Sequence, residues 1–137
     1  MKGAALIIET ILLAAAIILF LIALISTFNR MTTDFTRERI RHALRLDAEK
    51  VAYSILMARD LAGESGEATV YPELTANLQP TIWVEGGYLR AKAGGVQTRI
   101  SLYGLDSYVQ ISGRIKGTRI QKPYVRASSG AIQLGVE

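Results

Sequence analysis

The N-terminal part of the chain is almost uninterruptedly hydrophobic. From Ala4 to Phe28 the polar residues are Glu9, Thr10, Ser26 and Thr27. This run exceeds the roughly 20 apolar residues with which a helix crosses a lipid bilayer. The pattern therefore predicts a hydrophobic helix over residues 5–29 that spans a membrane once.

A secretory signal peptide is the competing interpretation of this segment. The hydrophobic core of a signal peptide spans only about 7–15 residues and ends at a cleavage site of small residues. The run here continues for longer, and residues 26–29 (Ser-Thr-Phe-Asn) make a poor cleavage site. A stop-transfer anchor fits the pattern better.

Hydrophobic positions after residue 30 recur at helical spacing. With no proline before Pro72 and no glycine between Gly3 and Gly63, one helix can continue to Ala62. Residues 29–36 are its weakest part, because threonine and aspartate are poor residues for a helix interior, and a kink or break there is an alternative. The sequence thus predicts an amphipathic helical continuation over residues 30–62, which ends at a turn over residues 63–66.

Two apolar stripes run along this amphipathic segment. The first consists of Ile40, Leu44, Ala48, Val51, Ile55, Ala58 and Ala62. The second and weaker stripe consists of Leu46, Tyr53, Met57 and Leu61. Two stripes indicate two partners, the chain's own C-terminal domain for one face and a neighbouring molecule for the other. The alternative is a single broad internal interface that holds both stripes.

Beyond residue 63 the hydrophobic period changes to two, which is typical of half-buried strands. Strands are expected at residues 68–71, 81–84, 88–92, 96–103, 107–115, 118–126 and 131–136. Gly86-Gly87 suits a two-residue hairpin turn, because both turn residues need positive φ. A domain of about 70 residues is marginal alone, so the sheet is expected to pack on the first stripe, with the last strand closing it. The predicted fold class is α+β: a long hydrophobic and amphipathic N-terminal helix, then a small antiparallel β-sheet or sandwich over residues 63–137.

The composition removes most catalytic chemistry from consideration. The 137 residues include no cysteine, which excludes disulfides, thiolate chemistry and cysteine-ligated metal, and a single histidine, His42, on the polar side of the helix. No pair of carboxylates has a spacing that suggests acid–base work, and residues 113–118 (GRIKGT) read as a hairpin turn rather than a phosphate loop. The sequence predicts a protein that is not an enzyme and that holds no cofactor or metal.

Basic residues exceed acidic ones, 16 against 12, and in the β-rich region they alternate with aromatic residues. The candidate surface-binding residues are Arg90, Lys92, Arg114, Lys116, Arg119, Lys122, Tyr88 and Tyr124, with Arg99, Arg126, Trp83, Tyr103 and Tyr108 in the same region. Such residues can hold nucleic acid through phosphate contacts and stacking. They can equally be ordinary outward positions of strands or part of a protein interface, and nucleic acid is therefore not among the expected partners.

Glu9 is the one charged residue inside the hydrophobic run. A carboxylate at the centre of a bilayer costs about 2.5–3.5 kcal/mol on insertion scales, and less near an interface, so such residues usually have a partner. The alternative is that Glu9, near the start of the helix, reaches the lipid headgroups. The small residues Ala14, Ala15 and Ala16 allow helices to approach closely in an apolar environment.

A short basic start with Lys2 and Gly3, then AALIIETILLAAAIILFLI with Glu9 among its first residues, then an amphipathic helix and a β-rich domain, resembles the type IV pilin superfamily. The resemblance is to archaeal pilin-like proteins with class III signal peptides in particular. It implies that a prepilin peptidase removes a leader, residues 1–4, after Gly3 or Ala4, so that Gly3, Ala4 and Ala5 form the processing site.

In that superfamily the glutamate at the fifth mature position neutralises the N-terminal amine of an adjacent subunit. A cut between Ala4 and Ala5 makes Glu9 that residue, whereas a cut after Gly3, the commoner choice, places it one position late. The resemblance implies that helices pack in a filament core, here through Leu6, Ile7, Leu12, Leu13, Ala14, Ala15 and Ala16. The missing aromatic residue at the new N-terminus and the missing disulfide favour an archaeal or minor pilin over a bacterial major pilin.

The distribution of basic residues conflicts with the orientation of a pilin. Only Lys2 precedes the hydrophobic run, and the basic residues that follow it are Arg30, Arg37, Arg39, Arg41, Arg45 and Lys50. The positive-inside rule places the C-terminal domain in the cytoplasm. The pilin resemblance places the N-terminus there, and we keep that orientation because the N-terminal motif is the more specific signal.

The main hypothesis is a structural subunit of a type IV pilus-like surface filament, anchored in the cell membrane before assembly and packed in the filament core afterwards. Its expected partners are further copies of itself, the membrane, and, by resemblance, the prepilin peptidase and the pilus assembly machinery. One alternative is a permanently anchored single-pass protein, either an accessory pseudopilin-type component or a surface binding protein. Another is a receptor for DNA or glycan that uses the basic, aromatic sheet.

Overall fold

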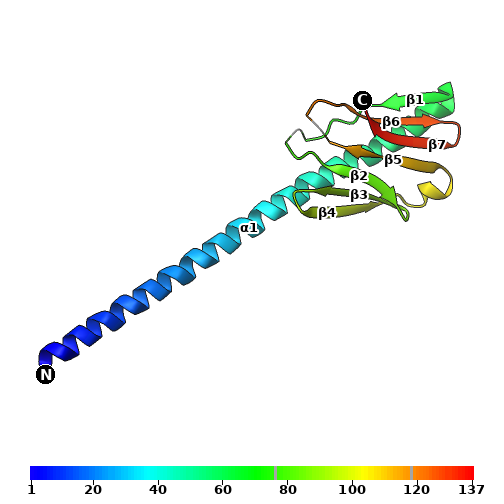
Figure 1. The fold of residues 1–137 in the computed structure, drawn as a ribbon. Coiled ribbons are helices and arrows are strands. Elements are labelled where there is room, and N and C mark those ends of the chain that lie inside the picture. Colours follow the sequence, from blue (N-terminus) through cyan, green and yellow to red (C-terminus); the bar gives the residue numbers. More distant parts are fainter. Residues whose placement is uncertain (76, 118) are drawn as a thin grey trace. The chain divides into compact units, whose positions relative to one another are not determined.

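The computed structural model describes residues 1–75, 77–117 and 119–137, apart from the side chain of Asp106. The fold is α+β, as predicted: helix α1 (Lys2–Ser65) precedes a seven-stranded sheet (Figure 1). The strands are β1 (Glu67–Val70), β2 (Thr81–Glu85), β3 (Tyr88–Ala93), β4 (Val96–Ser101), β5 (Gln110–Lys116), β6 (Pro123–Ser128) and β7 (Ala131–Val136), with a short 3₁₀ helix, η1 (Leu105–Ser107). The chain divides into two compact units, Met1–Arg37 and Glu38–Glu137.

The first unit, Met1–Arg37, consists of the N-terminal part of α1, and all of its side chains are exposed. Helical structure continues through residues 29–36, so the break considered as an alternative is absent from this stretch. The hydroxyls of the threonines there donate hydrogen bonds to backbone carbonyls one turn earlier. Thr32 Oγ1 donates to the carbonyl of Phe28 at 3.0 Å, and Thr33 Oγ1 donates to that of Asn29 at 2.9 Å. These internal hydrogen bonds satisfy the threonine side chains within the helix.

The second unit, Glu38–Glu137, contains the rest of α1 and the sheet, whose strand order is β1-β6-β7-β5-β2-β3-β4. The pairings are antiparallel except for β5 with β7, which is parallel. The last strand, β7, lies between β6 and β5 in the interior of the sheet. The sheet is therefore mainly antiparallel, and its final strand joins the two halves instead of closing an edge.

Paired glycines form two of the two-residue hairpin turns. The β2–β3 turn has positive φ at both central residues, Gly86 at 60° and Gly87 at 78°, as the sequence predicted. The β3–β4 turn repeats this arrangement at Gly94 and Gly95. Two consecutive positive φ values match the right-handed twist of the flanking strands, which is why these hairpins pair in register.

The core of the second unit forms between one face of α1 and one face of the sheet (Figure 1). The first apolar stripe is buried as predicted: Leu44, Val51 and Ile55 have no exposed surface, and Ile40 and Ala62 are partly buried at its ends. Facing them are buried strand residues such as Ile82 and Ile115. Complete burial of one such side chain contributes about 1.5–3 kcal/mol, so this interface stabilises a sheet that is marginal in size.

The second stripe remains uncovered. Leu46, Tyr53, Met57 and Leu61 are all exposed, so the alternative of one internal interface for both stripes is wrong. The helix also ends later than Ala62, at Ser65, because the N–H of Gly66 bonds to the carbonyl of Ala62 at 2.8 Å. Gly66 has φ of 85°, the left-handed conformation that favours glycine after a helix.

Several predicted strand boundaries are wrong. The expected strand 96–103 stops at Ser101, because Tyr103 and Gly104 have positive φ and turn the chain into η1. The strand expected from residue 107 begins at Gln110, after η1. The strand expected at 118–126 begins at Pro123, and Thr118 lies outside the described residues.

The hairpin turn expected at residues 113–118 is also wrong. Gly113 lies inside β5, with φ of 93°, and β5 pairs with β2 and β7 rather than with the strand that follows it. A Cβ at Gly113 would overlap the carbonyl oxygen of Leu134. This glycine permits the close approach of two parallel strands, and the sequence alone does not distinguish that role from a turn.

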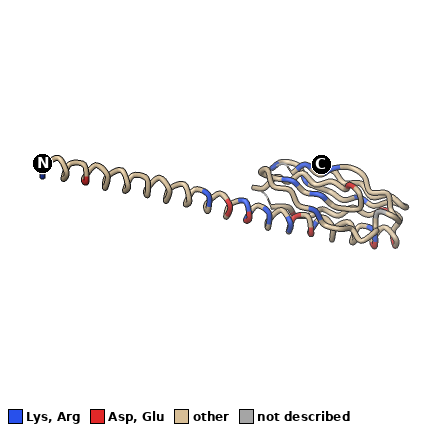
Figure 2. Tube along the Cα trace, turned by 90° about the horizontal axis from the view of Figure 1, so that it is seen from below, with Lys and Arg blue, Asp and Glu red and all other residues tan. Residues whose placement is uncertain are grey.

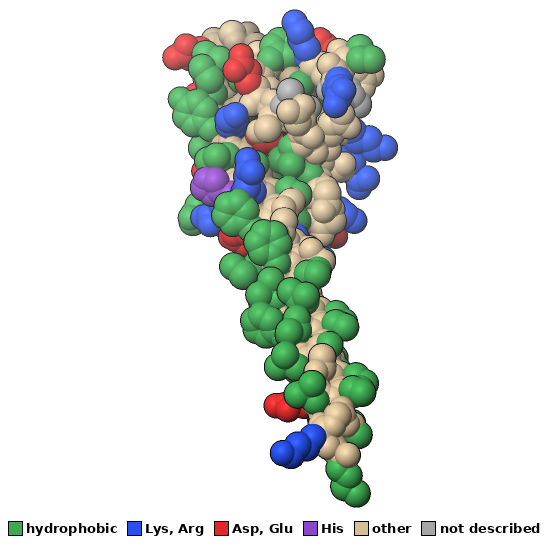
Figure 3. Space-filling view, turned by 90° about the vertical axis from the view of Figure 1, so that its left-hand side faces the viewer, with side chains coloured by type: hydrophobic (Ala, Val, Ile, Leu, Met, Phe, Trp, Pro, Cys, Tyr) green, Lys and Arg blue, Asp and Glu red, His purple; other side chains and the backbone are tan. Residues whose placement is uncertain are grey.

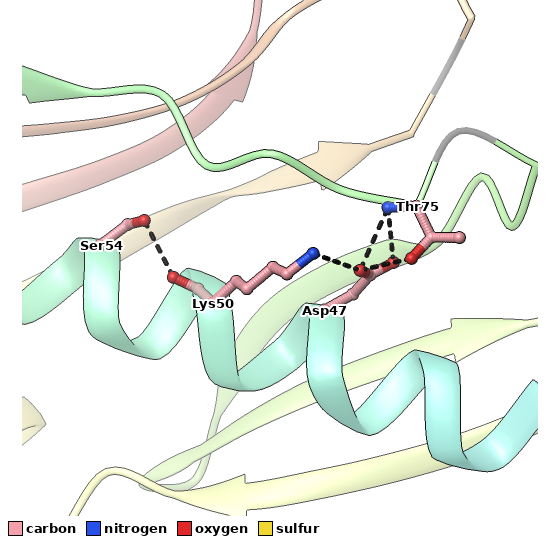
Figure 4. A network of polar contacts seen from close by, with 4 residues as sticks. All are labelled: Asp47, Lys50, Ser54 and Thr75. Atoms are coloured by element: carbon pink, nitrogen blue, oxygen red, sulfur yellow. Dashed lines mark hydrogen bonds and ion pairs between the residues drawn. The ribbon is translucent and has the colours of Figure 1, made fainter.

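Asp47 is a buried carboxylate that ties the chain between β1 and β2 to the helix (Figure 4). Both carboxylate oxygens accept a hydrogen bond from the backbone N–H of Thr75 at 3.1 Å, and Oδ1 accepts another from the Thr75 hydroxyl at 2.9 Å. Lys50 Nζ approaches Oδ1 at 3.9 Å. These contacts replace the water that Asp47 loses on burial, and they hold the loop against α1.

Candidate assembly helix and basic sheet face

The residues expected to form the processing site lie in the first turns of α1. Gly3, Ala4 and Ala5 are helical and exposed, and the N–H of Ala5 bonds to the carbonyl of Met1 at 3.4 Å. The expected packing residues follow on the same helix: Leu6, Ile7, Leu12, Leu13, Ala14, Ala15 and Ala16 are exposed. By length and composition α1 can cross a membrane, with an 18-residue window of mean hydropathy 2.9 that is 0% buried.

Glu9 differs from the two threonines of the hydrophobic run. Thr10 and Thr27 donate their hydroxyls to backbone carbonyls one turn earlier, Leu6 at 2.8 Å and Ala23 at 2.9 Å. A threonine can therefore satisfy its own side chain in an apolar environment. Glu9 is acceptor-only when ionised and has no ion pair within the described part of the chain. A partner for its charge has to come from lipid headgroups, water or another molecule.

Charged residues are absent from a long part of α1 after Glu9 and return as a mixed basic and acidic run (Figure 2). Within that run, Arg41 pairs with Glu38 at 2.9 Å and Arg45 with Glu49 at 3.2 Å. His42 is exposed beside them, on the polar side of the helix. Exposed pairs of this kind contribute little to stability, about 0.3–0.5 kcal/mol each, and they mark this side of the helix as solvated.

An apolar face of α1 in the second unit is left without cover. It consists of Leu46 (46% exposed), Tyr53 (68%), Leu56 (47%), Met57 (44%) and Leu61 (42%). We call these residues the uncovered helix face. The sequence predicted all of them except Leu56, which lies at i+3 from Tyr53, the spacing that extends the second stripe.

A groove borders the uncovered helix face. It has a volume of about 580 Å³ and lies between α1 and the segment from β4 to η1. Its lining is mainly apolar and includes Leu56, Ile100, Leu102 and Leu105. Tyr103 and Tyr108, which are 94% and 86% exposed, stand at its border. They belong to this groove and not to the basic surface with which the sequence grouped them.

Pairing of the strands gathers the basic residues on the sheet face opposite the helix. Across β5, β2, β3 and β4 the register aligns Arg114 with Trp83, Trp83 with Arg90, and Arg90 with Arg99. The adjacent row aligns Lys116 with Thr81 and Thr81 with Lys92. We call Arg90, Lys92, Arg99, Arg114 and Lys116, with Trp83 and Tyr88, the basic sheet face.

Aromatic rings lie beneath guanidinium groups on this side of the sheet. Arg99 lies 4.9 Å from the ring centre of Tyr88, Arg114 lies 5.5 Å from that of Trp83, and Arg126 lies 5.2 Å from that of Tyr124. Glu85 neutralises one end of the surface, with Oε2 at 3.3 Å from Arg90 Nε and from Trp83 Nε1. In the part of the chain that is described, Lys92, Arg99, Arg114 and Lys116 form no ion pair.

The remaining candidate residues lie outside the basic sheet face. Tyr124 packs its ring over Gly135, and its neighbour Arg126 is neutralised by Glu67 at 3.8 Å and Glu137 at 3.5 Å. Arg119 and Lys122 border a separate cavity of about 750 Å³ near Tyr71. The structure therefore joins four of the predicted basic residues, Arg90, Lys92, Arg114 and Lys116, and separates the other two.

Sequence reasoning missed Asp47 as a structural anchor. A signal was present, because Asp47 follows Leu44 by three positions and precedes Val51 by four, and so lies on the buried stripe. Across residues 1–75, 77–117 and 119–137 no group of His, Cys, Asp and Glu side chains could hold a metal ion. Comparison of the chain with protein-family models, with curated proteins and with solved structures gives no match.

Proposed function

We propose that this protein is a structural subunit of a type IV pilus-like surface filament. Before assembly α1 anchors the subunit in the cell membrane as a single span. In the filament the apolar part of α1 packs against the same part of other copies. The second unit, Glu38–Glu137, which we call the β-rich unit, is displayed at the surface. Cleavage of the leader by a prepilin peptidase precedes assembly in this proposal.

The observation that carries the proposal is the uncovered helix face. A permanent membrane anchor accounts for the exposed residues of the hydrophobic run, because lipid covers them. It leaves no role for Tyr53, Leu56 and Met57, which belong to the amphipathic segment and are exposed in the β-rich unit. A filament accounts for both, since neighbouring subunits bury apolar surface along the whole helix and gain about 25 cal/mol for each Å² of it.

Glu9 supports the same proposal through its charge. Inside a bundle of apolar helices a lone carboxylate is costly, and a carboxylate next to an ammonium group is much less so. Removal of the leader creates an N-terminal ammonium group at the end of each helix. Pairing of this amine with Glu9 of an adjacent copy stabilises the assembled state over the lipid-embedded monomer and sets the axial offset between subunits.

The test replaces Glu9 and counts filaments on cells. Glu9→Ala is expected to abolish filaments or to reduce them sharply, while membrane fractions still contain the protein. Thr10→Ala is the matched control, because it alters the neighbouring polar residue, whose hydroxyl bonds only within its own helix. Normal filament yield with Glu9→Ala would contradict the pairing.

A second measurement separates the filament from a permanent anchor. The intact mass of the protein purified from membranes is expected to lack residues 1–3 or 1–4. An intact N-terminus in material from cells that make filaments would favour the anchor. The two cleavage sites differ by the mass of one alanine, which decides whether Glu9 is the fifth or the sixth residue of the mature chain.

A further inference from the structure

We propose that the basic sheet face binds single-stranded nucleic acid. The inference is independent of the filament proposal, because it concerns a different surface and needs no second copy of the chain. Charge is its first basis: Lys92, Arg99, Arg114 and Lys116 are exposed cations on one side of the sheet. The two aligned rows contain no acidic residue, and Glu85, opposite Tyr88 at the margin, pairs with Arg90 and Trp83. In Figure 3, several blue side chains lie along the right-hand edge of the β-rich unit, and others lie elsewhere in the same view.

The spacing of these cations suits a phosphate backbone. Two residues along a strand separate side chains on one face by about 6.7 Å, and adjacent strands lie about 4.8 Å apart. Arg114 and Lys116 lie two residues apart on β5, and Arg90 and Lys92 lie two residues apart on β3, so each pair has the spacing of about 6.7 Å along a strand. Phosphates of an extended single strand repeat at a similar interval, so one strand can contact several cations in succession.

The stacked guanidinium groups favour nucleic acid over other polyanions. Arg99 and Arg114 lie over the rings of Tyr88 and Trp83, with each ring on one side of its guanidinium group. The opposite face and the edge N–H groups stay available, and unpaired bases stack on guanidinium planes while the edges bind phosphate. Because the arginines already cover the rings, a neutral sugar cannot stack on them directly. An acidic polysaccharide supplies charge but no planar base.

The position of these residues on the face of a sheet favours a single strand over a duplex. The groove and the cavity described above are lined by residues other than Trp83, Arg90, Arg99 and Arg114. A sheet face without a projecting helix or ribbon does not enter the major groove, and the bases of a duplex are not available for stacking. Preference for single strands is therefore the signature that separates this proposal from general attraction to polyanions.

The experiment measures binding to the full chain in a zwitterionic detergent. The probe is a fluorescein-labelled 20-mer of deoxythymidine, and its anisotropy is recorded at several salt concentrations. A labelled duplex of equal length and labelled heparin are the competing ligands. We expect tighter binding of the single strand than of either competitor, and an affinity that falls as salt rises.

Paired variants assign the binding to the surface. Arg99→Ala with Arg114→Ala is expected to weaken single-strand binding at least about tenfold, since the pair removes two phosphate-binding cations and two stacking groups. Arg99→Lys with Arg114→Lys keeps the charge and is expected to lose the preference over heparin. Arg41→Ala with Arg45→Ala is the matched control, because it removes the same charge from exposed positions on α1.

Each other outcome overturns the proposal. Equal affinity for heparin, duplex and single strand means a general polyanion surface. Equal loss in the Arg41/Arg45 control means a net-charge effect, and absence of single-strand binding at low salt removes the site altogether. Arg99 and Arg114 are exposed, so the variants are expected to fold, and their unfolding midpoints check this directly.

Discussion

Helix α1 contains two apolar stretches that differ in what covers them. Residues 4–28 are apolar on every side, and every one of them is exposed. In residues 40–62 the apolar residues form stripes, and one stripe is buried against the sheet. The chain therefore covers the apolar surface of its helix only where charged residues confine that surface to one face. A helix that is apolar all round needs lipid or other helices.

The uncovered helix face is the intermediate case. Its residues lie in the amphipathic stretch, yet they are exposed like those of the hydrophobic run. A sheet can pack against one side of a helix only, so the second stripe stays exposed in the single chain. The buried apolar residues of α1 thus stabilise the subunit, and the exposed ones are available for contacts between molecules. Three substitutions test this distinction.

Leu44→Ala is expected to have the largest effect on the free energy of unfolding of the β-rich unit. Leu44 is completely buried in the core, and truncation of such a leucine costs about 2–5 kcal/mol, because it removes apolar contacts and leaves a cavity. Trp83, the one tryptophan of the chain, provides the fluorescence signal for denaturant unfolding in detergent. Leu19→Ala is the control. Leu19 is 67% exposed in the first unit, so its substitution is expected to leave this transition unchanged. Equal losses of unfolding free energy from Leu44→Ala and Leu19→Ala would contradict the distinction between buried and exposed apolar residues.

Asp47→Ala is expected to destabilise the same unit by about 1.5–3 kcal/mol, the range for hydrogen bonds to a charged group. The substitution leaves the N–H and hydroxyl of Thr75 without their acceptor, and the loop before β2 is freed from the helix. Hydrogen exchange at the Thr75 amide is the most direct measurement, and protection there should fall more than protection in β3. Asp34→Ala removes an exposed carboxylate from the first unit and is the matched control. Unchanged protection at Thr75 would show that the loop is held by other contacts.

Tyr53→Ser is expected to have the smallest effect on stability, within about 0.5 kcal/mol, as for other exposed positions. Tyr53 is 68% exposed on the uncovered helix face, so the isolated subunit loses few contacts. If this face is an interface between subunits, filament yield falls although the unfolding midpoint stays the same. Arg45→Ser changes an exposed residue of the adjacent polar side and is expected to alter neither quantity. A Tyr53→Ser protein that is unstable, or that assembles normally, would remove this face from the proposed filament contacts.

The sequence predicted the main features that depend on local periodicity, although several strand boundaries, Asp47 and Leu56 escaped it. The hydrophobic run, the buried stripe of Leu44, Val51 and Ile55, and the hairpin turn at Gly86-Gly87 all follow from residues close together in the chain. Repeats of 3.6 and 2 residues distinguish helix from strand, and paired glycines identify a turn with positive φ. For the candidate site, helical spacing identified most of the uncovered helix face, because it places residues on one side. Glu9 was singled out as the one charged residue of the hydrophobic run.

The tertiary structure decided what depends on contacts between distant residues. Arg114, Trp83, Arg90 and Arg99 lie on four strands, and only the register of those strands aligns them in one row. The parallel pairing of β5 with β7 likewise gives Gly113 its role inside a strand, where local sequence resembles a turn. Strand order and register depend on which faces can be buried together, and no pattern within a single segment contains that information. Periodicity thus determines the elements and their apolar faces, and packing determines which polar residues become neighbours.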